Sequence, residues 1–198
     1  MKKTLIILFC SLILFSCERA PYIKDYKIEG IGLGDSLLDY FSEEEITTQI
    51  KVNRYKYKYD HLSEDFGNVN LFNENFEVYD HISFFVKPDD KKYIIYLIRG
   101  VIVYIEDSKR CHKKQNEIVE DFSKMFKDAK KVEQSFKSSY DPSGKSTIDK
   151  VKFIFNSGDE VQVNCSNYEE KLRMKNNWSE GLDVEISTKE VVDWLKNY

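Results

Sequence analysis

"YIIYLIRGVIVYIE", residues 93–106, is almost wholly apolar, although 32% of the residues in the chain are charged. The segment is shorter than the ~20 apolar residues that a membrane-spanning helix needs, and Arg99 and Gly100 interrupt it. We therefore predict two strands joined by a tight turn at Arg99-Gly100. Apolar residues on both faces indicate that this hairpin lies at the centre of a sheet and is covered by helices on one side.

Further strands are predicted on either side of this hairpin. Residues 52–60, "VNRYKYKYD", alternate strictly, which places Tyr55, Tyr57 and Tyr59 on one strand face and the basic residues on the other. The remaining strands are expected at about 79–87, 131–139, 148–156, 159–165 and 182–187. Polar turns such as "DPSGKS" and "NSGD" connect the strands of the second half, and such short connections favour antiparallel pairing.

The clearest helix is "CHKKQNEIVEDFSKMFKDA", residues 111–129. Its apolar residues recur with helical spacing and form one buried stripe, made of Ile118, Val119, Phe122, Met125 and Phe126. Capping patterns predict three shorter helices. These patterns are Asp35 before a helix through Phe41, Ser42 with Glu45 before a helix to about Ile50, and Ser187 with Glu190 before the C-terminal helix.

This order of elements predicts an α+β fold, with a mostly antiparallel sheet and amphipathic helices packed on it. It also indicates two similar α-plus-strands halves, at about 35–106 and 107–187. We expect one folded domain over residues 28–198. A polar tether over 17–27 and a signal segment over 1–16 precede it.

The first seventeen residues combine a basic start with the apolar run "TLIILFCSLILF" and a small residue before a cysteine. This pattern resembles the lipobox of bacterial lipoproteins, matched by Leu14, Ser16 and Cys17, whereas Phe15 departs from the smaller residue usual there. The resemblance implies cleavage between Ser16 and Cys17 and attachment of lipid to Cys17, which would hold the protein on a membrane. The alternative is an ordinary secretory signal with a chance cysteine.

Glu18 follows the cysteine, where lipoproteins retained at the inner membrane commonly carry Asp. The resemblance therefore implies the outer membrane, facing the periplasm. The segment "IGLGDSLLDYFSEEEI", residues 31–46, resembles small uncharacterised bacterial envelope lipoproteins. It is also similar in pattern to outer-membrane assembly lipoproteins built as helices on a small antiparallel sheet, although no functional residue carries over from them.

Cleavage would remove Cys10, and lipid would occupy Cys17, which leaves Cys111 and Cys165 as two thiols in an oxidising compartment. We predict that they form a disulfide, which would close a loop of 54 residues and stabilise the fold by roughly 4 kcal/mol. The alternative is two separate buried thiols.

Other motifs give weaker signals. "DPSGKST", residues 141–147, resembles the end of a phosphate-binding loop but lies between two strands and lacks the first glycine, so we interpret it as a hairpin turn. His61, His81 and His112 show no metal-ligand spacing, and we expect no metal and no cofactor. The acidic net charge of −4 gives no electrostatic reason to expect nucleic-acid binding.

No catalytic motif emerges, so we expect a non-catalytic envelope protein that binds a protein partner or a small ligand. A periplasmic hydrolase is the competing hypothesis, and a deep pocket that gathers His81 or His61 with acidic residues would favour it. An inhibitor or immunity-type protein is a third hypothesis, which an exposed acidic concave face would support.

Overall fold

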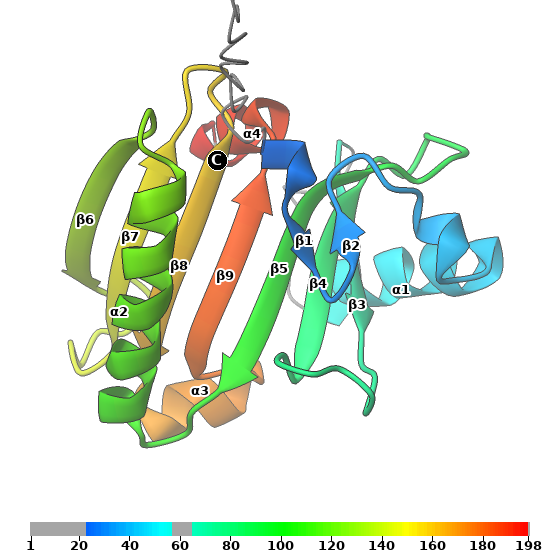
Figure 1. Cartoon of the computed structure of the whole chain (residues 1–198). Coiled ribbons are helices and arrows are strands. Elements are labelled where there is room, and N and C mark those ends of the chain that lie inside the picture. Colours follow the sequence, from blue (N-terminus) through cyan, green and yellow to red (C-terminus); the bar gives the residue numbers. More distant parts are fainter. Residues whose placement is uncertain (1–22, 57–64, 198) are drawn as a thin grey trace, which may run out of the picture.

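The computed structural model describes residues 23–56 and 65–197 (Figure 1). The first half contains η1 (Ile23–Asp25), β1 (Lys27–Ile28), β2 (Ile31–Gly32), η2 (Leu37–Asp39), α1 (Glu43–Lys56), β3 (Gly67–Leu71), β4 (His81–Val86) and β5 (Ile95–Val103). The second half contains α2 (Ser108–Met125), β6 (Lys130–Lys137), β7 (Thr147–Ile154), β8 (Glu160–Asn167), α3 (Glu170–Asn176), β9 (Gly181–Ser187) and α4 (Lys189–Lys196).

Seven strands form one antiparallel sheet in the order β3-β4-β5-β9-β8-β7-β6, and β1 pairs with β2 in a separate small sheet. The predicted α+β class and the mostly antiparallel sheet are confirmed. Each half supplies a helix followed by a meander of strands that runs inward from one edge, and the halves join where β5 pairs with β9. This topology agrees with two similar α-plus-strands units.

The predicted hairpin at Arg99-Gly100 is wrong, because β5 is one strand that continues through both residues. Arg99 pairs with Ser83 of β4 on one side and with Glu185 of β9 on the other, so the strand is central in the sheet. Gly100 is needed for close packing and not for a turn. A Cβ atom at this position would lie only 2.5 Å from the ring of Tyr79.

One face of the sheet is apolar and carries most of the core. In Figure 1, α2 lies across this face in front of β7 and β8. Phe126, just after α2, packs against Phe153 of β7 with ring centroids 5.6 Å apart, and Phe153 is fully buried. Burial of such a side chain stabilises the fold by roughly 1.5–3 kcal/mol.

The opposite face bears Ser83, Arg99, Gln162 and Glu185, and we call it the polar face. At one end, α4 covers it through Trp194, whose ring centroid lies 5.0 Å from that of Phe66. α3 lies at the other end of the sheet, below β9 and β5 in Figure 1. The polar face is therefore flanked by one helix at each end.

The strand predicted over residues 52–60 is also wrong. Helix α1 continues to Lys56, and residues 57–60 lie outside the described residues. The predicted capping box starts this helix, since the Ser42 N–H donates to Glu45 at 2.8 Å and the Glu45 N–H donates to the Ser42 hydroxyl at 3.3 Å. Ile46, Ile50 and Asn53 then face β3, which overrides the alternating pattern that follows.

Two other predicted caps are displaced by one residue. Ser36, not Asp35, caps η2, because Asp35 instead accepts a hydrogen bond from the Gly32 N–H at 2.9 Å. Thr188 caps α4, because the Ser187 hydroxyl donates to Glu185 at 2.9 Å. In both places a hydrogen bond to a residue two or three positions earlier takes the side chain that the pattern assigned to the cap.

Three segments are more ordered than predicted. β3 and α3 lie within residues 61–77 and 166–180, two stretches where the sequence predicts no strand or helix. Ile23–Lys27, which we assigned to the tether, belong to the folded domain. Ile23 is buried in the core, and the ring of Tyr26 packs edge-on against Phe126 at 4.8 Å.

Candidate functional site

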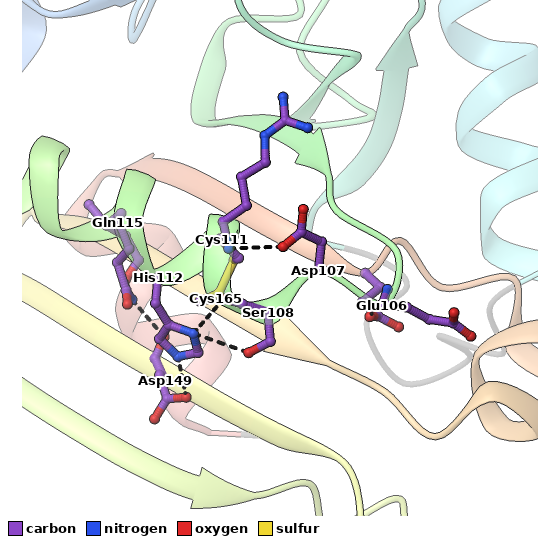
Figure 2. Close-up of a disulfide and its surroundings, with 11 residues drawn as sticks. Glu106, Asp107, Ser108, Cys111, His112, Gln115, Asp149 and Cys165 are labelled. Atoms are coloured by element: carbon purple, nitrogen blue, oxygen red, sulfur yellow. Dashed lines mark hydrogen bonds and ion pairs between the residues drawn. A yellow bond between two sulfur atoms is a disulfide. The ribbon is translucent and has the colours of Figure 1, made fainter.

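Cys111 and Cys165 come together as a disulfide between the start of α2 and β8 (Figure 2). Their Cα atoms are 5.9 Å apart, within the usual range for a disulfide, and both side chains are buried. The bond links α2 covalently to β8 on the apolar face, so the two cysteines hold elements of the core together. Cys17 and Ser16 lie outside the described residues.

His112 lies beside the disulfide and links α2 to β7, as Figure 2 shows. Its Nδ1 lies 2.7 Å from the Ser108 carbonyl oxygen and 3.1 Å from the Ser108 hydroxyl, and its Nε2 lies 2.9 Å from Asp149. The hydrogen bond to Asp149 raises the pKa of His112. In the protonated form both ring nitrogens donate, one to the Ser108 carbonyl and one to Asp149, so this form of His112 has no free lone pair with which to activate Ser108.

An ion cluster occupies the centre of the polar face. The Arg99 Nε atom lies 2.9 Å from Glu185 and 3.7 Å from Asp183. Burial alone would raise the pKa of Glu185, but the adjacent guanidinium lowers it overall. Burial raises the pKa of Asp183, which has the weaker contact with Arg99. The cluster keeps a charged, hydrogen-bonding surface on two neighbouring central strands.

A cleft of about 560 Å³ opens on the polar face at the α3 end of the sheet. Its floor is formed by the ends of β3, β4 and β5, where Asn70, His81 and Val103 lie. α1 lines one side, and the segment after α3, with Trp178, lines another. The volume falls within the roughly 300–1,000 Å³ typical of small-molecule sites.

His81 is a half-buried imidazole in this cleft. Its ring stacks on that of Phe72 with centroids 5.1 Å apart. Burial lowers the pKa of His81, and Arg99 lowers it further, against an opposing effect of Asp80. None of the described residues forms a hydrogen bond with either ring nitrogen of His81, so a neutral imidazole here has one free donor and one free acceptor.

The two carboxylates that line the cleft are held by backbone groups. Asp80 accepts from the Val103 N–H at 2.7 Å, and Glu180 accepts from the Glu106 N–H at 2.9 Å. Glu180 also forms an ion pair with Arg173 at 3.6 Å. These contacts fix both carboxylates where the strands end and leave neither bonded to His81.

Asn70 connects the floor of the cleft to α1. Its amide oxygen accepts from the Ser83 hydroxyl at 2.5 Å, and its backbone N–H donates to the Gln49 side chain at 2.8 Å. Ser83 and His81 lie two residues apart on β4 and share the polar face, but the Ser83 hydroxyl bonds Asn70 and not His81.

Several residues singled out in the sequence lie elsewhere. His61 is outside the described residues, and His112 is on the apolar face. "DPSGKS" is a turn, as predicted. Asp141 closes it by accepting hydrogen bonds from the backbone N–H groups of Ser143 and Ser146, at 2.9 and 2.7 Å.

Sequence reasoning missed Phe72, Arg173 and Trp178, because all three lie in segments that we expected to be irregular. The only available signal was their residue type, an aromatic or arginine side chain within a polar stretch. Trp178 is further supported by the ring of Tyr168, whose centroid lies 4.9 Å away. The cleft is therefore a product of tertiary structure and not of any contiguous motif.

Within residues 23–56 and 65–197, His, Cys, Asp and Glu side chains nowhere gather in threes that could hold a metal ion. In the same part of the chain, none of the helices combines the length and the hydrophobicity that crossing a bilayer requires. Comparison of the chain with protein-family models, with curated proteins and with solved structures finds no match.

Proposed function

We propose that this chain is a bacterial envelope lipoprotein, anchored through Cys17, whose domain binds a ligand or a protein partner in the cleft on the polar face. The observation that carries the binding function is the cleft itself, where His81 has unused hydrogen-bonding capacity beside the exposed ring of Phe72. The lipobox-like residues Leu14, Ser16 and Cys17 support the anchor. The Cys111–Cys165 pair supports folding in an oxidising compartment.

The length of the tether limits how far the folded domain can lie from the proposed anchor. Ile23 lies six positions after Cys17 in the sequence, so the attachment point lies at most about 20 Å from the folded domain. In Figure 1, η1, which contains Ile23, lies at the same end of the sheet as α4 and the start of β5. The cleft contains Val103 at the other end of β5, about 30 Å away for a strand of this length.

An anchored protein would therefore hold the end with η1 and α4 toward the membrane and the cleft toward the compartment beyond it. With Glu18 after the cysteine, we propose the outer membrane, with the domain in the periplasm. The ligand then comes from the aqueous side and not from the bilayer that holds the anchor.

Binding is better supported than hydrolysis at this cleft. A histidine that acts as a general base is usually oriented by a third group that bonds its second ring nitrogen. His81 has no such partner among the described residues, and the Asp80 and Glu180 carboxylates already accept backbone hydrogen bonds. The hydrolase hypothesis thus has residue types in its favour but no catalytic geometry.

The anchor is tested by replacing Cys17 with serine and following incorporation of a labelled fatty acid. We expect Cys17→Ser to abolish labelling and to leave the protein in the soluble fraction or as uncleaved precursor. The matched control is Cys10→Ser, which should label normally because the signal segment is removed. Unchanged labelling of Cys17→Ser would overturn the proposal.

A further inference from the structure

The chemistry of the cleft lining indicates a class of ligand. Amide side chains line it through Gln49, Asn53 and Asn70, and each amide carries both donors and acceptors. Two aromatic rings, Phe72 and Trp178, belong to the same lining, and the Phe72 side chain is 72% exposed. Such a site suits a ligand that has many mixed donor-acceptor groups and also an apolar face.

An extended peptide fits this floor poorly, because peptides commonly bind by adding a strand to a free sheet edge. β4 and β5 are paired on both sides. The outer edge of β3 is occupied by α1, where Gln49 accepts from the Asn70 N–H and the Asn53 amide donates to the Asn68 carbonyl at 2.8 Å. The floor therefore offers side chains and no free backbone.

The charges of the lining disfavour anionic ligands. Arg173 is paired with Glu180, which leaves the Asp80 carboxylate as an excess negative charge in the cleft. A phosphate or sulfate group would meet this carboxylate without an unpaired cation to offset the repulsion. The polar lining similarly disfavours a purely apolar ligand, which would cover the ring nitrogens of His81 without giving them hydrogen-bond partners.

We propose that the cleft binds a neutral oligosaccharide, an inference that rests on the binding function proposed above. Sugar hydroxyls both donate and accept, which matches the unpartnered ring nitrogens of His81. It also matches the part of each amide's hydrogen-bonding capacity that is not used within the fold. The C–H face of a sugar ring packs on aromatic rings, and Phe72 and Trp178 provide two such rings at the cleft. Arg173, held by its ion pair with Glu180, also belongs to this lining.

Calorimetry on the purified domain, with chitopentaose, cellopentaose and maltopentaose as probes, tests this inference. We expect at least one probe to bind and Phe72→Ala to weaken that binding about tenfold or more. Because Phe72 is largely exposed, the substitution should leave the fold intact, which circular dichroism verifies. The matched control is Phe136→Ala, which removes an exposed ring of β6 outside the cleft and should leave the affinity unchanged.

Fluorescence locates the bound sugar. The chain has two tryptophans, of which Trp194 is buried against Phe66 and Trp178 lines the cleft. In Trp194→Phe protein, Trp178 is the only tryptophan left. With excitation selective for tryptophan over tyrosine, we expect the sugar that binds to shift or quench its emission. A bound sugar that leaves Trp178 emission unchanged would overturn the assignment to this cleft.

Two further outcomes separate this inference from the binding function on which it rests. If no neutral sugar binds at about 10 mM while a neutral ten-residue peptide binds and Phe72→Ala weakens it, the sugar assignment fails and binding in the cleft stands. If Phe72→Ala and Phe136→Ala reduce sugar affinity equally, both the sugar assignment and the cleft as its site fail.

Discussion

Removal of the disulfide should cost this domain a large part of its stability. The Cys111→Ala/Cys165→Ala variant opens a loop whose ends are 54 residues apart in the sequence. For a loop of that length, the chain-entropy model gives a loss of about 14 cal/mol/K, or about 4 kcal/mol at 25 °C. This is a substantial fraction of the roughly 5–15 kcal/mol that stabilises a typical domain.

Urea unfolding, followed by tryptophan fluorescence and by circular dichroism, measures this effect. We expect the free energy of unfolding to fall by about 4 kcal/mol, and the melting temperature to fall by about 2–4 °C per kcal/mol for a domain of this size. The slope of the free energy against urea concentration should rise, because an unfolded chain without the cross-link exposes more surface.

Wild-type protein in reductant is the matched control, since it loses the bond but retains both sulfur atoms in the core. Its stability should approach that of the double variant, with a small difference for the cavities left by two alanines. A loss below about 1 kcal/mol in both proteins would refute the reasoning, because the constraint on the unfolded chain would then be far weaker than its length implies. Two alkylatable thiols in denatured, unreduced protein would show that the bond does not form.

Two other substitutions test particular contacts. Gly100→Ala should destabilise the fold by about 1–3 kcal/mol, because the new methyl group would overlap the ring of Tyr79, and an unchanged urea midpoint would contradict this packing. His112→Gln should remove a stability contribution that is present below about pH 6.5 and lost as the pH rises through the raised pKa of His112. Urea midpoints of wild type and variant between about pH 5.5 and 8.5 measure this difference, which should shrink as the pH rises. Burial lowers the pKa of His81, so the contribution of His81 to stability rises with pH. This contribution is the same in wild type and variant, and it therefore cancels in their difference.

Much of the fold follows from patterns in the sequence. Four members of the predicted α2 stripe are buried or half-buried, but Met125 is 39% exposed, and the helix ends at Met125 and not at residue 129. The strands of the second half lie close to their predicted bounds. These elements have one buried and one exposed side, or polar turns at their ends, so their periodicity is visible. The capping box of Ser42 and Glu45 is equally local and forms as predicted.

Prediction failed where tertiary contacts override local patterns. A strand buried on both faces has no alternation to show whether it continues or turns at Gly100, and the decisive contact is with Tyr79, twenty-one positions earlier. In α1, contacts of Ile50 and Asn53 with β3 favour a helix where the following residues alternate as in a strand.

Little of the candidate site could be predicted from the sequence. Its lining comes from α1, three strand ends and the segment after α3, and these meet only when the two meanders join at β5 and β9. Of its members, His81 was singled out by residue type, whereas Phe72 and Trp178 had no pattern around them. The residues that line the cleft are far apart in the sequence, so no contiguous motif marks this site.

Intact-mass spectrometry of the protein purified from native membranes tests the proposed anchor and location most directly. We predict a polypeptide that begins at Cys17 and carries a diacylglycerol on its sulfur. A polypeptide that retains Met1, or one that begins at Cys17 with an unmodified thiol, would contradict the proposal.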